Sequence, residues 1–208
     1  MDLSPEQQDL PGQRGPHHHE MRERIVRAAE ARFRHFGYGK TTVSEIAADL
    51  GVSSAYIYKF FGSKIAICEA VCASLLGRID EALWAEARSP RTAAERLRRT
   101  YRLLLEHSLA LFFNERRLHD MVITGLDQRW ASISRHVEVM EEVARFLVQE
   151  GRASGEFERK SPLDEVAKAV ASTFSPFCHP VLLEHGIDDD PGAKAEAVAT
   201  IVLRGLSA

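Results

Sequence analysis

The chain has 208 residues, of which 45% are hydrophobic and 27% charged, so it can bury one sizeable core or two smaller ones. It has no run of eighteen apolar residues, no apolar N-terminal signal and only three cysteines, which argues against a membrane span, a secreted precursor and a disulfide framework. The net charge of −3 combines −2 over residues 1–19, +3 over the basic segment 20–64 and −4 over the acidic remainder 65–208. This asymmetry is typical of a protein that meets phosphate with one end only.

The N-terminus begins with a segment that lacks any apolar period. Residues 1–18 are polar and rich in proline and glycine, so we expect a disordered arm. The histidine run at residues 17–19 could hold a metal ion, but we interpret it as part of a solvated tail. A helix is predicted from Glu20 to Phe36, where apolar residues return at helical spacing, and Gly37 ends it as a cap.

Three further helices are predicted at short intervals. Thr42 and Glu45 form a capping-box pattern, which predicts a second helix that ends at Gly51. A third, short helix is predicted from Ser53 to about Phe60. The fourth is predicted from its cap, Ser63, to about Arg88.

The second and third helices have the spacing of a helix-turn-helix over about residues 42–61. This motif needs a small residue where the helices touch, a glycine able to take a positive φ in the turn, and an apolar anchor on the second helix. Ala47, Gly51 and Ile57 supply these three features. The alternative is an ordinary corner between two helices of a bundle.

The segment from Arg24 to Lys64 resembles the DNA-binding domain of the TetR family of tetracycline-repressor-like regulators. Its sequence, RIVRAAEARFRHFGYGKTTVSEIAADLGVSSAYIYKFFGSK, contains nearly every element of the family pattern in order. Downstream of it, the chain resembles the family only in being helical. The resemblance implies an all-α fold, with a three-helix helix-turn-helix domain over residues 19–79 and a helical effector-binding and dimerisation domain over residues 80–208.

The resemblance also implies roles for nine residues near operator DNA. The DNA-binding set is Thr41, Thr42, Ser53, Ser54, Ala55, Tyr56, Tyr58, Lys59 and Lys64. Within it, Thr42, Ser53, Tyr58 and Lys64 correspond to clamps on the phosphate backbone. Ser54, Ala55, Tyr56 and Lys59 correspond to the face that reads the major groove. Ala55 and Lys59 depart from the glycine and histidine that are common there, which bears on the DNA sequence that is read.

Beyond residue 90 the sequence predicts about five helices and no strand pattern. Apolar residues repeat at intervals of three and four in the last two predicted helices. They are Leu163, Val166, Val170, Phe174, Phe177 and Val181, followed by Ala197, Ile201 and Gly205. The spacing alone fits an internal core face equally well, whereas the resemblance implies that this helix pair forms a homodimer interface.

The same half of the chain is predicted to hold a small apolar or aromatic effector. Aromatic and polar residues mingle there, and the candidate lining residues are His107, Trp130, Phe174, Phe177 and His179. Phe112, Phe113, His119 and His136 belong to the same mixture but are not among the candidates. Pro176 and Pro180 remove amide donors within one predicted helix, so the helix should kink and open space beside Phe177 and His179. Such a pocket should exceed roughly 300 Å³, and the alternative is that these aromatic rings pack on one another.

The cysteines give weaker indications of a metal site. Cys68 and Cys72 stand four residues apart on one predicted helix face, a workable spacing for two ligands. That face is apolar, however, and buried cysteine behaves there as a small hydrophobic residue. We therefore predict no metal and no cofactor.

Together these patterns predict a cytoplasmic, homodimeric repressor that binds double-stranded, palindromic operator DNA and is released by a small molecule, with no membrane partner. One alternative is a helical enzyme without a DNA role, although no nucleophile–base pair or cofactor loop can be assembled from the sequence. Another is a DNA-binding activator or a ligand-independent regulator.

Overall fold

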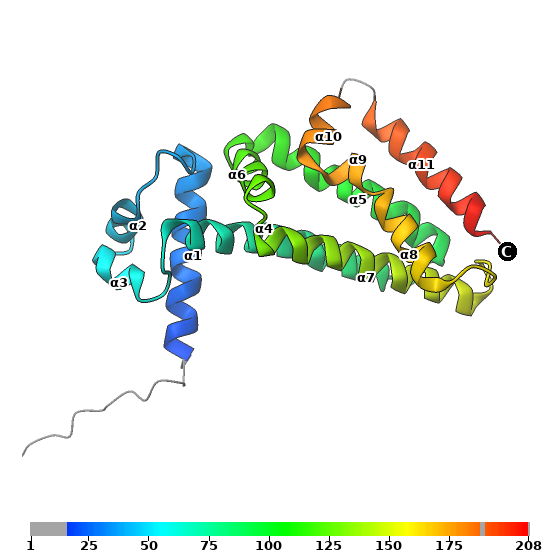
Figure 1. Cartoon of the computed structure of the whole chain (residues 1–208), viewed down its shortest axis with the longest axis horizontal. Coiled ribbons are helices and arrows are strands. Elements are labelled where there is room, and N and C mark those ends of the chain that lie inside the picture. The colour runs from blue at the N-terminus through cyan, green and yellow to red at the C-terminus, as the bar shows by residue number, and fades with distance from the viewer. Residues whose placement is uncertain (1–15, 188–189, 208) are drawn as a thin grey trace, which may run out of the picture.

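The computed structural model describes residues 16–187 and 190–207, and over these residues the chain is built from helices without a strand (Figure 1). One isolated bridge joins Phe157 to Ser207. The helices are α1 (Pro16–Phe36), α2 (Val43–Asp49), α3 (Ser54–Tyr58), α4 (Lys64–Ala87), α5 (Ala93–Asn114), α6 (Arg116–Asp127), α7 (Ala131–Ser154), α8 (Leu163–Ser172), α9 (Ser175–Cys178), α10 (Pro180–His185) and α11 (Pro191–Leu206). The predicted all-α class is confirmed. In the described part, no helix is long and apolar enough to cross a membrane.

The first helix starts four residues earlier than predicted. α1 begins at Pro16, so the arm predicted over residues 1–18 is too long at its C-terminal end, and its residues 1–15 lie outside the described part. Proline suits a first turn because its missing N–H would have no intrahelical partner there. The His18 ring lies 4.7 Å from the Phe60 ring, a contact that attaches this turn to the rest of the protein.

α1, α2, α3 and the first half of α4 form a compact unit, which we call the head (Figure 1). Its core is formed by side chains that are at most 2% exposed, including Ile25, Phe33, Ile46, Ile57 and Phe61. Each of the first three helices therefore contributes a fully buried anchor. Burying one such side chain contributes about 1.5–3 kcal/mol, which is how a unit with such short helices holds together.

The remaining helices form the body, and α4 passes from one unit into the other (Figure 1). Ile67 and Val71 of α4 lie in the core of the head, whereas Leu83 and Ala87 of the same helix lie in the core of the body. α6 also crosses the boundary. Its Met121 packs into the core of the head, although the helix comes from the C-terminal half of the chain.

A carboxylate fixes the start of α5 in the body. Glu156 accepts hydrogen bonds from the amides of Ala93 and Ala94, each at 3.0 Å, and from the hydroxyl of Ser154 at 2.9 Å. Burial acts to raise the pKa of Glu156, but the two amides and the hydroxyl outweigh it and hold the pKa below its usual value. The carboxylate thereby satisfies amides that have no partner within the helix.

The segment predicted as one kinked helix from Leu163 onward is divided into α8, α9 and α10. Its apolar stripe faces the inside of the protomer. Val170 is 4% exposed, and Phe174 and Phe177 are at most 1% exposed in the core of the body. These three residues therefore do not face a partner, because α5 and α7 of the same chain cover them, whereas Val181 of the same stripe is 37% exposed. The homodimer interface through the last two helices stays a prediction.

Candidate DNA interface and ligand cavity

The turn between α2 and α3 has the geometry that a helix-turn-helix requires. Gly51 takes a φ of +67°, in the left-handed region that glycine adopts without steric penalty. The amides of Gly51 and Val52 donate to the carbonyls of Ala48 and Ala47, at 3.1 and 3.0 Å, which reverses the chain within a few residues. Ala47 is 2% exposed, and its small side chain allows close packing of the two helices. The predicted motif is confirmed.

Two arginines of α1 anchor this motif. Arg32 forms a two-point ion pair with Asp49 at the end of α2, with one of the bonds at 2.8 Å. The hydrogen bonds from Arg32 hold the pKa of Asp49 below its usual range. Arg22 donates to the carbonyl of Phe60 at 2.8 Å, and its guanidinium lies 4.0 Å from the centre of the Phe61 ring. The helix-turn-helix is thus attached to α1 at two places, the end of α2 and the residues just after α3.

α3 and its flanking residues present a polar, accessible face. The Ser53 hydroxyl caps α3 by accepting from the amide of Tyr56 at 3.1 Å, and Ser54 donates to the hydroxyl of Ser44 at 3.0 Å. Tyr58 is 49% exposed. Eight of the nine predicted DNA-binding residues are at least partly exposed, namely Thr42, Ser53, Ser54, Ala55, Tyr56, Tyr58, Lys59 and Lys64.

Thr41 is the exception. Its side chain is 1% exposed, and its hydroxyl donates to the carbonyl of Gly37 at 2.9 Å. Gly37 ends α1 with a φ of +85°. The Thr41 side chain therefore stabilises the turn between α1 and α2, and its assignment to DNA contact is corrected. The neighbouring Thr42 forms the predicted capping box, with its amide 2.7 Å from the Glu45 carboxylate.

Three lysines give the face positive charge. Lys40 and Lys59 are exposed, Lys64 is half-buried, and in the described ranges none of the three has a carboxylate partner within 4.0 Å. The Lys64 ammonium lies 4.4 Å from the centre of the Tyr38 ring, at the first residue of α4. Ser63 caps that helix, whose N-terminal amides favour an anion. This arrangement suits a phosphate group.

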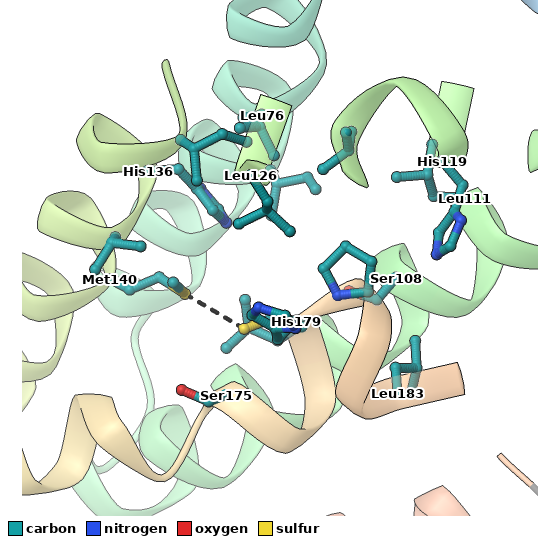
Figure 2. Close-up of a pocket in the computed structure, with 17 residues that line it drawn as sticks. Leu76, Ser108, Leu111, His119, Leu126, His136, Met140, Ser175, His179 and Leu183 are labelled. Atoms are coloured by element: carbon teal, nitrogen blue, oxygen red, sulfur yellow. Dashed lines mark hydrogen bonds between the residues drawn. The ribbon is translucent and has the colours of Figure 1, made fainter. Parts of the chain in front are cut away.

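The body contains a cavity between α4, α5, α6, α7 and the α9–α10 segment (Figure 2). Its volume is about 100 Å³, so the prediction that the pocket exceeds roughly 300 Å³, the size that holds a drug-sized ligand, is wrong for this cavity. The walls are predominantly aliphatic. The lining residues are Leu76, Ile79, Leu104, Ser108, Leu111, His119, Val122, Leu126, Ile133, His136, Val137, Met140, Ser175, Cys178, His179, Pro180 and Leu183.

A break in the helix places His179 in the cavity wall. Pro180 has no amide hydrogen and disfavours a helical conformation in the residue before it. His179 accordingly takes φ −76° and ψ 118° between α9 and α10. The prediction that the prolines open space beside His179 agrees with this geometry, although they divide the helix rather than kink it.

The other four predicted ligand residues lie elsewhere. His107 is exposed on α5. Trp130 is 5% exposed in the core of the head, where its ring covers Gly125. The Phe174 and Phe177 rings pack edge-on against Tyr101, at 4.9 and 6.0 Å between ring centres. For these two, the alternative that the aromatic rings pack on one another is the correct one.

Two histidines of the cavity were not among the predicted site residues. His119 lies on the face of α6 that carries Val122 and Leu126, and His136 lies on the face of α7 that carries Met140. The intervals of three, four and seven residues are helical, so helix phase could have placed each histidine on an apolar face. Nothing local to either helix indicates that the two faces meet.

The three cysteines are free thiols, of which Cys68 and Cys72 are buried and Cys178 is partly buried. Burial raises the pKa of Cys68 to about 12 and that of Cys72 to about 11. Burial also raises the pKa of Cys178 to about 12. Among the residues described, no group of three or more His, Cys, Asp or Glu side chains could hold a metal ion.

A helix-turn-helix on one unit and a cavity in the other define a one-component DNA-binding regulator. Residues 25–71 match the family described as bacterial regulatory proteins, tetR family, and residues 93–199 match the tetracyclin repressor-like C-terminal domain. The chain belongs to the TetR family and is a DNA-binding transcriptional regulator. Comparison with curated proteins gives no match.

Solved structures share the fold over nearly the whole chain. A TetR-family transcriptional regulator from Pectobacterium atrosepticum is 20% identical, with a TM-score of 0.72, and the match covers 94% of this chain and 98% of that one. A transcriptional regulator from Cytophaga hutchinsonii is 22% identical over 89% and 98% of the chains, with a TM-score of 0.67. The regulator FadR from Bacillus subtilis, in complex with stearoyl-CoA, is 21% identical over 88% and 95%, with a TM-score of 0.56.

Proposed function

We propose that the protein is a homodimeric repressor, released from a palindromic operator when a small molecule enters the cavity of the body. The observation that supports this most is that one helix, α6, lines the cavity and also packs in the core of the head. His119 and Val122 of α6 line the cavity, and Leu118 and Met121 pack in the core of the head. The proposal assigns the chain no catalytic reaction.

Ion pairs add to the connection between the cavity helix and the head. Arg34 of α1 donates to Glu115, at the start of α6, at 3.0 Å, and also to Glu30 at 3.0 Å. Arg78 of α4 donates to the same Glu30 carboxylate at 2.9 Å. A displacement of α6 therefore acts on α1 through both apolar packing and charge.

The size of the cavity indicates how an effector would act. At about 100 Å³ it is filled by a molecule of a few non-hydrogen atoms, and a larger ligand must move a wall. α6 and the short α9–α10 segment are the walls that pack least extensively on the rest of the protein, since α4, α5 and α7 pack along the length of the body. We infer that binding displaces α6 and, with it, the head.

The dimer of this proposal uses outward faces of the last helices. Ile201 of α11 is 64% exposed, and Ala197 and Gly205 lie exposed on the same side of that helix. A twofold dimer places its recognition helices about 34–36 Å apart, or a multiple of that distance, to reach successive major grooves. A small change in that distance affects both half-sites together.

The proposal is tested by measuring the binding of purified protein to DNA from upstream of its own gene, by fluorescence anisotropy, with and without candidate ligands. An effector should lower operator affinity by roughly 1–3 kcal/mol, the usual size of such a coupling. Native mass spectrometry of the purified protein should show two copies per complex. A monomer at micromolar concentration, or sequence-specific DNA binding that no cavity ligand changes, would contradict the repressor–effector proposal and favour a ligand-independent regulator. Transcription that rises with the bound protein would indicate an activator.

A further inference from the structure

The chemistry of the cavity wall restricts what it can hold. None of the seventeen residues around it is Asp, Glu, Lys or Arg, and none is Phe, Tyr or Trp. The polar groups come from three histidines, two serines and one cysteine. A charged ligand would therefore be buried without a counter-ion, and a cationic one would also lack an aromatic face.

Two of the histidines have ring nitrogens that are buried without a partner. His119 is 2% exposed, and neither of its nitrogens forms a hydrogen bond within the described part of the chain. The carboxylate of Asp120 is 3.7 Å from its Nδ1, which is beyond hydrogen-bond reach. The Nδ1 atom of His179 is likewise buried and unpartnered. Buried polar groups normally have a partner, so these nitrogens are available to a bound molecule.

The charge state of His119 follows from its surroundings. Burial lowers its pKa, and the positive charge of Arg116 lowers it further, whereas Asp120 and Glu184 act in the opposite direction with less effect. The net direction is downward, so the ring is neutral at neutral pH. A neutral imidazole offers one N–H donor and one acceptor nitrogen.

His136 completes the set from the opposite wall. In Figure 2 it lies across the cavity from His119, with His179 between them. Its Nδ1 is 2.5 Å from a carboxylate oxygen of Asp80, which lies outside the cavity wall. Asp80 thus accepts a hydrogen bond from the Nδ1–H group of His136 and orients the ring. The other ring nitrogen, Nε2, is left for the cavity.

We propose that the cavity binds a neutral aliphatic molecule that carries one hydroxyl or carbonyl oxygen, a compact alcohol or ketone held by His119 and His179. The inference rests on the proposed function, since it names the chemical class of the effector. A cavity of 150 Å³ in another protein accommodates the six non-hydrogen atoms of benzene, so one of about 100 Å³ holds about four, and an effector of about six must displace a wall, as the proposed function requires. A hydroxyl both donates and accepts and a carbonyl oxygen accepts, so either can pair with the neutral imidazole of His119, whereas a carboxylate would be buried without a cation. Arg116, whose charge acts on His119, is already paired with Asp120 and Glu184, at 3.3 and 2.8 Å.

The test compares three probes of six non-hydrogen atoms each and different charge: cyclopentanol, cyclopropanecarboxylate and cyclopentylammonium. Isothermal titration calorimetry of the full-length protein at neutral pH should show cyclopentanol binding at least tenfold more tightly than either ion. His119→Leu should weaken cyclopentanol at least tenfold. Because that change removes an unpaired buried polar group, the variant should fold at least as stably as the wild type. His107→Leu, at an exposed position outside the cavity, is the matched control and should bind as the wild type does.

Equal or tighter binding of the carboxylate or the ammonium would overturn the proposed ligand class. So would a His119→Leu variant that binds cyclopentanol like the wild type. A separate measurement of operator affinity distinguishes this failure from failure of the proposed function. If cyclopentanol binds through His119 but DNA affinity stays constant, the ligand class holds and the effector role fails. If an anionic ligand releases the DNA while cyclopentanol does not bind, the effector role holds and the ligand class is wrong.

Discussion

Replacing Lys64 by alanine should weaken binding to every DNA sequence by a similar factor. The Lys64 ammonium stands at the capped N-terminus of α4 beside Tyr38, without a carboxylate partner in the described residues. If each subunit of a dimer loses one phosphate contact, about 0.9 of a counterion per subunit is no longer released. At 0.1 M salt this corresponds to a factor of about eight per contact and about sixty for the dimer. The slope of log K against log salt should become shallower by about 1.8.

The assay is fluorescence anisotropy with a 30-base-pair duplex of arbitrary sequence, titrated at several KCl concentrations, so it does not require the operator. Lys160→Ala is the matched control because that lysine is exposed between α7 and α8, at the end of the body farthest from the head (Figure 1). A salt slope for Lys64→Ala that equals those of the wild type and of the control would refute the phosphate assignment. So would a change in the preferred DNA sequence, the result expected instead for Lys59→Ala on the face of α3.

Three further predictions concern assembly and stability. Ile201→Glu places a charge on the exposed face of α11 and should convert the dimer to a folded monomer in sedimentation, whereas Val170→Glu, buried in the body, should unfold the protomer. Gly51→Ala should lower the free energy of unfolding by about 1 kcal/mol because its φ is positive, whereas Gly77→Ala, in open space within α4, should raise it by up to about 1 kcal/mol. An increase for Gly51→Ala or a decrease for Gly77→Ala in chemical denaturation would contradict this. Glu156→Gln should lower the free energy of unfolding by about 1 kcal/mol at neutral pH, because the cap on α5 is weakened. Because the pKa of Glu156 is depressed in the folded state, the wild type is more stable than the variant above the unfolded pKa near 4.5. This difference in stability should disappear as the pH falls through the folded pKa. A difference in melting temperature that is independent of pH would refute this.

The head could be predicted from the sequence because its determinants are local. The capping box of Thr42 and Glu45 spans three residues, and Gly51 needs only its own φ to end α2. Thr41 was misassigned because the family pattern gives its position and not the direction of its side chain. That direction is set by the hydroxyl's bond to Gly37.

The cavity could not be predicted because several distant segments build it. An apolar stripe shows which side of a helix is buried, but not what covers it, so the Val170 stripe was assigned to a partner rather than to the protomer's own core. Phe174 and Phe177 were assigned to the pocket for the same reason. Thr173 and Tyr101, 72 residues apart, are joined by a hydrogen bond, and the rings of Phe174 and Phe177 pack on Tyr101 rather than in the cavity wall.

The shared α4 has a consequence for how such regulators can be recombined. Ile67 and Leu83 lie on one uninterrupted helix but in different cores, so no flexible linker separates the DNA-reading unit from the sensing unit. A chimera that joins this head to another body has to be spliced within that helix, in register, and has to replace α6 together with the head it supports. Grafting the N-terminal residues alone would leave Met121 facing a surface that it does not fit. Evolution of a new sensing specificity is accordingly easier by substitution around the cavity than by exchange of whole modules.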